Sequence, residues 1–132
     1  MTSRAPSEVV PLDRCSVRTV DAERVEAARR QLPADDEIEG LTRLFRLVGD
    51  TTRARLLYAL VEAGELCVCD LAATIDATET TVSQALRLLR TAGVVRARRV
   101  GRKMNYRLDD AHVRMLLDLS REHLRHATDE AR

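Results

Sequence analysis

Apolar side chains recur every three or four residues along most of this chain, the spacing that places them on one face of an α-helix. Suitable N-cap residues, Asp50 and Thr78, precede two of these stretches, and Gly64 and Gly93 stand where two of them end. The pattern predicts six helices: residues 21–32, a stretch that follows the acidic residues 35–37 and runs to Gly49, and residues 51–63, 70–75, 79–91 and 110–129.

The apolar period changes to two in residues 94–98 and 104–108, as it does in β-strands. Gly101 lies between them among cationic residues, so we expect a β-hairpin with a basic tip. Residues 1–20 have little apolar periodicity and are expected to form an arm. The chain has 132 residues and only three aromatic ones, so a single core must be built from Leu, Val and Ala. The predicted fold is mainly α with a β-hairpin wing (α+β).

The predicted order of a short helix, a tight turn, a longer helix and a basic hairpin is that of a winged helix-turn-helix. In such a unit the second helix places its N-terminal residues in the major groove, where Gln84 can address adenine and Arg87 guanine or phosphate. An all-helical interaction module with a basic face is the alternative. The predicted DNA-contacting residues are Thr80, Thr81, Ser83, Gln84 and Arg87 on the helix and Arg99, Arg102 and Lys103 on the wing.

Charge is distributed unevenly along the chain. Residues 80–108 contain eight Lys or Arg and no acidic residue, a local charge of +8, whereas the whole chain carries +1, so the remainder carries −7. This asymmetry is typical of a face that binds a polyanion such as DNA. A merely solvated charged face is the alternative, although solvated faces usually mix the two signs.

Cys67 and Cys69 stand at the predicted start of the helix-turn-helix, and Cys15 lies in the arm. Three cysteines are an odd number, which favours metal ligation or sensing over a disulfide framework. A helix start lowers thiol pKa and favours thiolate, but two thiolates are too few for a closed site, and the only other thiol is that of Cys15. A thiolate site of this kind prefers Cd²⁺, Pb²⁺, Bi³⁺ or arsenite to hard cations. Buried thiols that pack as small apolar groups are the alternative.

All three histidines, His112, His123 and His126, lie in the last predicted helix, with Asp110 just ahead of it. At about 100° and about 1.5 Å per residue, His112 and His123 share a face but stand about 16 Å apart. One ion cannot bind both, because Zn–N bonds are about 2.1 Å long. Two antiparallel copies of the helix would bring Asp110 and His112 of one protomer to His123 and His126 of the other, giving two zinc-type sites per dimer. Exposed histidines and an N-capping Asp110 are the alternative.

Several classes of protein are excluded by the sequence. No apolar run approaches the about 18 residues of a membrane-spanning helix, and the N-terminus lacks the apolar segment of a signal peptide, so we expect no membrane partner and a cytoplasmic location. No glycine-rich phosphate loop, second carboxylate or oxyanion motif accompanies the cysteines and histidines, so we expect no enzyme and no organic small-molecule substrate. A thiol redox switch, in which Cys67 and Cys69 are oxidised and bind no metal, is an alternative function for the same fold.

The motifs resemble the ArsR/SmtB family of metal-sensing winged-helix repressors. The matching stretches are residues 48–53 (VGDTTR), 65–71 (ELCVCDL), 82–90 (VSQALRLLR), 101–108 of the wing and 110–112 (DAH). The resemblance implies a homodimer that binds operator DNA without metal and releases it when metal binds. It assigns residues 1–37 to an arm and first helix, 38–108 to the DNA-binding domain and 109–132 to a helix for dimerisation and metal.

The closer likeness is to the cadmium/lead-sensing branch, in which an arm cysteine reaches the C-x-C pair of the other protomer. Cys15 matches the first arm cysteine, whereas the second is Thr19 here, which removes one sulfur from a four-thiolate site. Arsenite is the second candidate inducer, since arsenite sensors that resemble this stretch can carry a further thiol near Ala72. In the last helix His126 replaces the family's usual glutamate. Zn²⁺ therefore stays a candidate ion for this site, and Ni²⁺ and Co²⁺ become further candidates.

Overall fold

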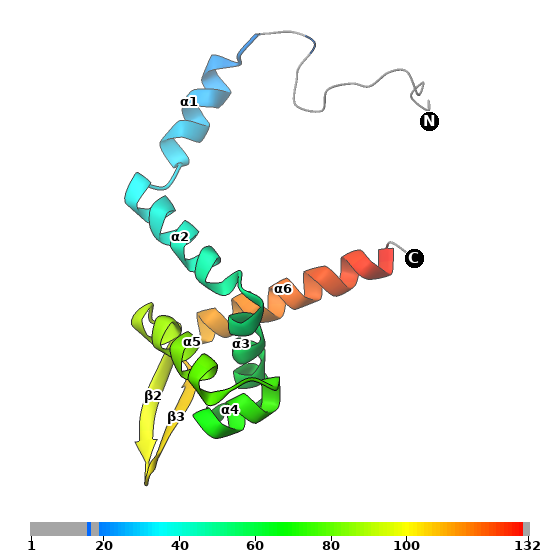
Figure 1. The fold of residues 1–132 in the computed structure, drawn as a ribbon. Helices are drawn as coiled ribbons and strands as arrows, with labels where there is room; N and C mark the ends of the chain where they lie inside the picture. Colours follow the sequence, from blue (N-terminus) through cyan, green and yellow to red (C-terminus); the bar gives the residue numbers. More distant parts are fainter. Residues whose placement is uncertain (1–15, 17–18, 131–132) are drawn as a thin grey trace. The chain divides into compact units, whose positions relative to one another are not determined.

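The computed structural model describes Ser16 and residues 19–130, which form helices and a small antiparallel sheet (Figure 1). The chain divides into two compact units, with the boundary between residues 35 and 36. The elements are α1 (Ala22–Gln31), α2 (Asp35–Val48), α3 (Thr51–Ala63), β1 (Glu65–Cys67), α4 (Val68–Ile75), α5 (Glu79–Thr91), β2 (Val95–Val100), β3 (Lys103–Leu108) and α6 (Ala111–Glu130). The predicted α-rich fold with a β-hairpin wing is confirmed.

The first unit contains α1. Asp21 caps this helix, since its Oδ1 accepts a hydrogen bond from the backbone N–H of Arg24 at 3.1 Å. No residue of α1 is buried, and Val25 on its apolar face is 43% exposed. The helix therefore has no core of its own to pack against.

The core of the second unit joins side chains of α3, α4, α5, β2 and α6. Helix α3 begins after Asp50, whose Oδ2 accepts from the backbone N–H of Arg53 at 3.0 Å, and it ends at Gly64, whose φ of 83° favours glycine. The predicted inward face of α3 is confirmed as buried. The largest fully buried side chains of the core include Leu56, Leu57, Leu60, Leu71, Leu86 and Leu89.

Helices α4 and α5 form the predicted helix-turn-helix. Helix α4 begins at Val68, two residues before the predicted start, and ends at Ile75, followed by the C-cap residue Asp76 in the left-handed conformation. Thr78 caps α5 as predicted, because its Oγ1 accepts from the backbone N–H of Thr81 at 3.1 Å. Apolar positions of both helices enter the core, which fixes α5 against α4.

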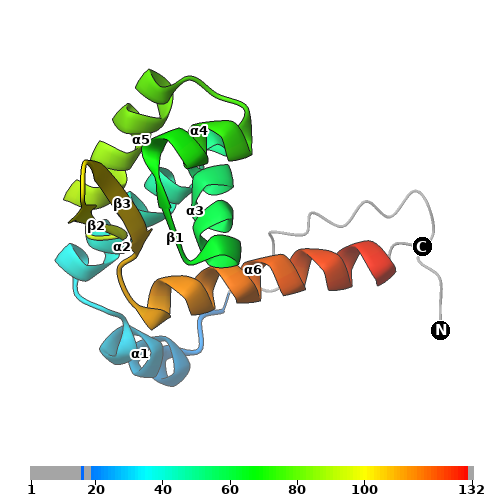
Figure 2. The ribbon, with the colours of Figure 1, turned by 90° about the horizontal axis from the view of Figure 1, so that it is seen from below.

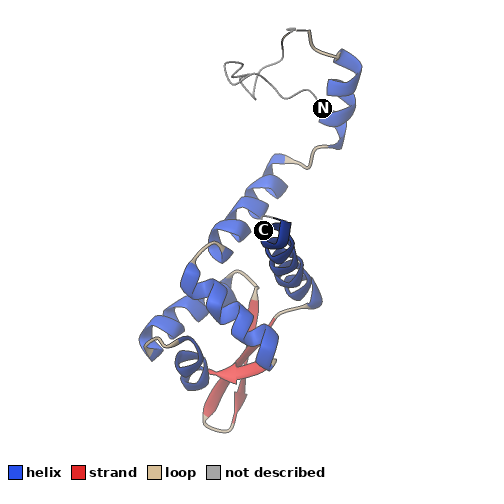
Figure 3. Ribbon diagram, turned by 90° about the vertical axis from the view of Figure 1, so that its right-hand side faces the viewer, coloured by secondary structure: helices blue, strands red, loops and turns tan. Residues whose placement is uncertain are grey.

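The hairpin of β2 and β3 is part of a three-stranded sheet in the order β1-β3-β2, with all neighbours antiparallel (Figures 2 and 3). Gly101 lies in the connecting turn with φ of 62°. Strand β1 was not predicted; it places Cys67 opposite Asn105 of β3. The thiol-bearing segment is therefore an edge of the wing's own sheet.

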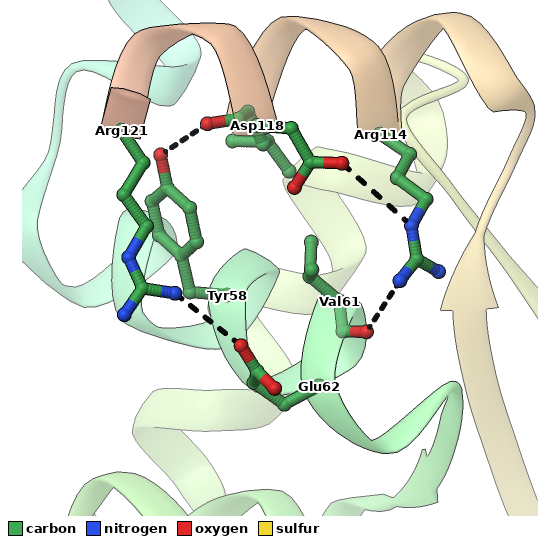
Figure 4. A network of polar contacts seen from close by, with 7 residues as sticks. Tyr58, Val61, Glu62, Arg114, Asp118 and Arg121 are labelled. Atoms are coloured by element: carbon green, nitrogen blue, oxygen red, sulfur yellow. Dashed lines mark hydrogen bonds and ion pairs between the residues drawn. The ribbon is translucent and has the colours of Figure 1, made fainter. Parts of the chain in front are cut away.

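Helix α6 is attached to α3 by polar contacts at two levels (Figure 4). The Tyr58 hydroxyl donates to the backbone carbonyl of Leu117 at 2.8 Å, and Nη2 of Arg114 donates to the carbonyl of Val61 at 3.2 Å. Arg121 pairs with Glu62 at 3.3 Å and lies 6.0 Å from the centre of the Tyr58 ring. Leu117 is the one buried residue of α6, and partly buried Val113 also packs against the core, so these two side chains and the polar contacts hold the helix against α3.

Helices α2 and α6 expose many apolar side chains in the single chain. Leu44, Leu47 and Val48 of α2 pack against the core, while its predicted apolar face also leaves residues exposed. The prediction that the acidic residues 35–37 precede this helix is wrong, because they form the first turn of α2. Large apolar side chains that are exposed in number on a helix are typical of interaction sites. The exposed side chains include Ile38, Leu41, Phe45, Met115, Leu119 and Leu124.

Among the residues with a described structure, no helix has the length and apolar character needed to cross a membrane.

Candidate nucleic-acid interface and metal-ligand residues

The outer face of α5 carries the predicted base-contacting residues. Val82, Ala85, Leu86 and Leu89 are buried, which directs the intervening positions outward. Part of the hydrogen-bonding capacity of Thr81 is already used, because the Thr78 hydroxyl donates to its Oγ1 at 2.9 Å. The exposed polar residues of this face are Thr80, Thr81, Ser83, Gln84 and Arg87.

The tip of the wing is cationic and exposed. Arg99 lies near the end of β2, Arg102 in the turn and Lys103 at the start of β3, and all three are exposed. None of them takes part in the ion pairs of the described residues. Their charges are thus available to a polyanion.

Two cations of the basic stretch have acidic partners from outside it, so not all of its local charge of +8 is unpaired. Nε of Arg96 lies 2.8 Å from Oδ1 of Asp109, and Nε of Arg98 lies 2.8 Å from Oε1 of Glu65. Both acids lie outside residues 80–108, so the composition of that stretch could not show them. The available charge is concentrated at the tip of the wing and on α5.

The thiol pair lies where β1 meets α4. Cys67 is 4% exposed, ends β1 and occupies the N-cap position of α4 without a side-chain cap bond. Cys69 is exposed in the first turn of α4, and its Sγ lies 3.6 Å from Oε1 of Glu79 in the first turn of α5. Cys15 lies outside the described residues.

The prediction of a lowered thiol pKa at this helix start is wrong for Cys69. The negative charge of Glu79 raises the pKa of the Cys69 thiol, and the hydrogen bond to Glu79 raises it further. The carboxylate therefore favours the protonated form of the thiol. Metal ligation at Cys69 therefore has to displace the thiol proton.

The predicted ligands of the last helix lie along α6 and at its start, and all are exposed. Asp110 caps the helix, since its Oδ1 accepts from the backbone N–H groups of His112 at 3.0 Å and Val113 at 3.1 Å. These bonds, that of Val113 most of all, lower the pKa of the Asp110 carboxyl. Nδ1 of His112 lies 3.7 Å from Oδ2 of Asp110, and Nε2 of His126 lies 3.4 Å from Oε1 of Glu130.

Within the part of the chain that the structure describes, no three His, Cys, Asp or Glu side chains gather closely enough to hold a metal ion. The donor atoms that are present are still suited to metals, since thiolate and imidazole bind Zn²⁺ and softer ions. Neither predicted set of metal ligands comes together in the described part of one chain. Cys67 and Cys69 have no described third thiol, and His112 and His123 lie far apart on one helix.

Sequence reasoning missed Glu65, Glu79 and Asn105. Glu65 bonds to Arg98 and Asn105 across the sheet, which requires β1 to exist. Glu79 approaches Cys69 because the turn before α5 brings the first turns of two helices together. The only signal for Glu79 in the sequence is its position as an acidic residue directly after the N-cap Thr78.

The fold and the exposed basic face define a winged helix-turn-helix DNA-binding protein. A family model described as "Bacterial regulatory protein, arsR family" matches residues 50–97. A cadmium resistance transcriptional regulatory protein CadC homolog of Staphylococcus aureus is 34% identical over 113 residues, which cover 86% of this chain and 93% of that protein. The chain belongs to the ArsR/SmtB family of transcriptional regulators, and the relatives that it resembles are DNA-binding regulators and not enzymes.

Two solved structures extend this relation. The AntR antimony-specific transcriptional repressor is 31% identical, has a TM-score of 0.62 and is matched over 98% of this chain and 99% of that chain. A homodimeric winged helix-turn-helix domain of Mb0332 from Mycobacterium bovis is 27% identical, has a TM-score of 0.63 and is matched over 73% and 94% of the two chains. Homodimers therefore occur among the structural neighbours of this chain.

Proposed function

We propose that this chain is a metal-responsive repressor that binds operator DNA as a homodimer and releases it when a Cd²⁺, Pb²⁺ or Zn²⁺-type ion binds. The observation that carries the proposal is the position of Cys67 and Cys69 at the start of α4, the helix that packs directly against α5. A ligand at these thiols acts on the helix-turn-helix itself. Release of the operator would allow expression of metal efflux or resistance genes.

The DNA-binding half of the proposal rests on exposed residues. Helix α5 offers Gln84 and Arg87 to base edges and phosphates, with Thr80, Thr81 and Ser83 beside them. On the wing, Arg99, Arg102 and Lys103 bind phosphate or enter a minor groove. In a dimer, two copies of α5 would enter successive major grooves of the operator.

The metal-binding half rests on donor chemistry and on relatives. Cys67 and Cys69 would be joined by Cys15 from the other protomer, a set of soft ligands suited to Cd²⁺ or Pb²⁺. The CadC homolog is by its name a cadmium resistance regulator, which supports this class of inducer. Asp110 and His112 of one protomer with His123 and His126 of the other would form a second site, suited to Zn²⁺ and also to Ni²⁺ or Co²⁺.

The exposed apolar faces of α2 and α6 support the homodimer, because a second copy would cover them. We assign residues 1–37 to the arm and first helix, 38–108 to the DNA-binding part and 109–132 to the dimerisation and metal-binding helix. Metal would hold the dimer in a geometry whose two copies of α5 fit successive grooves poorly. The coupling is reciprocal, so DNA weakens metal binding by the same factor.

A trivalent metalloid such as arsenite is the alternative inducer. The full-length likeness to an antimony-specific repressor supports it, because arsenic and antimony in their trivalent forms both bind thiolates. A thiol redox switch is supported less, since oxidation favours thiols with a low pKa and the pKa of Cys69 is raised.

The test is a titration of the full-length dimer on DNA selected from a random library by the metal-free protein. Fluorescence anisotropy follows DNA release by Cd²⁺, Pb²⁺, Zn²⁺, Ni²⁺, arsenite and antimonite. Cys15→Ser should abolish release by Cd²⁺ while the metal-free DNA affinity stays unchanged, and Ser16→Ala should behave as the wild type. If Cys15→Ser keeps its response to Cd²⁺, the arm is not part of the sensor; release by peroxide in the presence of a chelator, with none by metals, would favour the redox switch.

A further inference from the structure

One carboxylate and one thiol from the two helices of the helix-turn-helix lie within reach of a single ion. Oε1 of Glu79, in the first turn of α5, is 3.6 Å from Sγ of Cys69, in the first turn of α4. Both side chains are exposed, so an ion can reach them from solvent. The prediction of ligands from the sequence did not include Glu79.

The separation of the two atoms fits shared coordination. With a Zn–S bond of about 2.3 Å, a Zn–O bond of about 2.1 Å and a tetrahedral angle, the sulfur and oxygen ligands of one ion stand about 3.6 Å apart. The two atoms already have this spacing, so Cys69 and Glu79 can bind one ion without a movement of α4 relative to α5. Cys67, two residues before Cys69 at the end of β1, is the nearest further thiol in the sequence.

We propose that Glu79 is an oxygen ligand of the thiol metal site and that it links this site directly to the DNA-contacting helix. The proposal rests on the proposed function, since it requires that Cys69 binds metal. On ligation the Cys69 thiol loses its proton to solvent and forms a sulfur–metal bond. Glu79 then exchanges its hydrogen bond with the thiol for an oxygen–metal bond.

The position of Glu79 gives this ligand a consequence for DNA binding. It begins α5 and immediately precedes Thr80, while Ser83 and Gln84 lie about one turn further on. An ion that holds Glu79 to Cys69 fixes the N-terminal turn of α5 to α4. That turn is the part of the helix that must adjust to base edges in the major groove.

A ligand set that contains both sulfur and oxygen also predicts which ions the site prefers. Zn²⁺ and Co²⁺ accept carboxylate beside thiolate, whereas trivalent arsenic takes thiolates. Removal of the Glu79 carboxylate should therefore weaken the binding of divalent ions and leave arsenite binding unchanged. The alternative is that Glu79 only accepts a hydrogen bond from the metal-free thiol, in which case no metal property depends on it.

The experiment is a titration of the full-length protein with Co²⁺ under anaerobic conditions, for the wild type, Glu79→Gln and Asp76→Asn. Asp76→Asn is the matched control: it removes one exposed negative charge from the turn between α4 and α5, and Asn tolerates the left-handed conformation of that position. We expect sulfur-to-cobalt charge-transfer absorption in all three proteins. In Glu79→Gln alone, the ligand-field bands should shift and the Co²⁺ affinity should fall at least tenfold, with arsenite affinity within twofold of the wild type.

Two further results distinguish a failure of this proposal from a failure of the proposed function. If Glu79→Gln has the ligand-field spectrum and Co²⁺ affinity of the wild type, Glu79 is not a ligand, and the proposed function stands as long as metal still releases the operator. If the wild type shows no charge-transfer absorption, the thiols bind no metal and both proposals fall. In operator titrations, the factor by which Zn²⁺ reduces DNA affinity should shrink at least fivefold in Glu79→Gln, measured against the metal-free affinity of the same variant.

Discussion

Glu65 and Arg98 form a two-point ion pair that joins β1 to β2. Nε of Arg98 lies 2.8 Å from Oε1 of Glu65, and Nη2 lies 2.9 Å from Oε2. Nδ2 of Asn105 on β3 donates to the same Oε2 at 3.1 Å, so one carboxylate contacts all three strands of the sheet. Because Cys67 ends the strand that Glu65 begins, the wing is tied to the thiol-bearing segment.

The first prediction concerns acid stability. The hydrogen bonds from Arg98 and Asn105 lower the pKa of Glu65 from 4.5 to about 2. A carboxyl group with a lowered pKa in the folded protein contributes stability that is fully present above pH 4.5 and is lost as the pH falls towards 2. Glu65→Gln should therefore reduce the free energy of unfolding at pH 7, and its difference from the wild type should shrink between pH 4.5 and pH 2. Urea unfolding of both proteins at several pH values measures this difference.

Glu122→Gln is the control for this series, because Glu122 is exposed on α6 and outside the ion pairs of the described residues. Its difference from the wild type should be small and vary little with pH. A Glu65→Gln difference that stayed constant down to pH 2 would contradict the assignment of the stabilisation to the ionised carboxylate.

The second prediction concerns the attachment of α6 to α3. Tyr58→Phe removes the hydrogen bond to the carbonyl of Leu117 and keeps the ring that Arg121 covers. The loss should be about 1 kcal/mol in the free energy of unfolding, the usual net value of one such bond. Tyr106→Phe is the control, since no side-chain hydrogen bond of Tyr106 is found in the structure of the described residues. Equal stability of Tyr58→Phe and the wild type in urea would show that the bond contributes nothing.

The helix-turn-helix and wing could be predicted from sequence because their signals are local. Asp50, Thr78 and Gly64 mark helix ends by their own side-chain or backbone chemistry, and the buried face of α3 follows from apolar spacing. Strand β1 has only three residues and exists because β3 pairs with it, so no periodicity could predict it.

The candidate site was predictable only as residue types. Thr80, Gln84 and Arg87 are exposed as expected, because the same helical period that buries Leu86 directs them outward. The contacts that set the chemistry are not local: Glu79 raises the pKa of Cys69 from another helix, and Glu65 pairs with Arg98 from another strand. Such contacts depend on the turn and on the sheet, which spacing along the chain does not encode.

The third prediction concerns the reactivity of Cys69 without metal. Because the charge of Glu79 raises the pKa of this thiol, Glu79→Gln should lower that pKa and increase the thiolate fraction at pH 8. Alkylation of Cys69 by iodoacetamide should then be several-fold faster, as measured by mass spectrometry of the peptide that contains it. Asp76→Asn should alkylate at nearly the wild-type rate, and an unchanged rate in Glu79→Gln would mean that the carboxylate does not control the thiol.

The fourth prediction concerns the wing. Arg102→Ala should weaken operator binding and reduce the slope of log affinity against log salt by about 0.9, the value for one lost phosphate contact on duplex DNA. Arg96→Ala is the matched control, because Arg96 is already paired with Asp109 at 2.8 Å and should leave the slope nearly unchanged. Anisotropy titrations at several salt concentrations give both slopes, and an unaltered slope in Arg102→Ala would remove the wing tip from the DNA interface.

The fifth prediction concerns the histidines of α6. In a protein whose three cysteines are replaced by serine, only the site on the last helix should bind Zn²⁺, with one ion per protomer. Replacing His123 and His126 together by Ala should abolish that binding, because each symmetric site would lose two of its three imidazoles and keep only Asp110 and His112. Glu130→Gln is the control: it removes the carboxylate 3.4 Å from Nε2 of His126 and should keep the stoichiometry. Equilibrium dialysis decides, since unchanged Zn²⁺ binding in the double histidine variant would identify His123 and His126 as surface residues without a metal role.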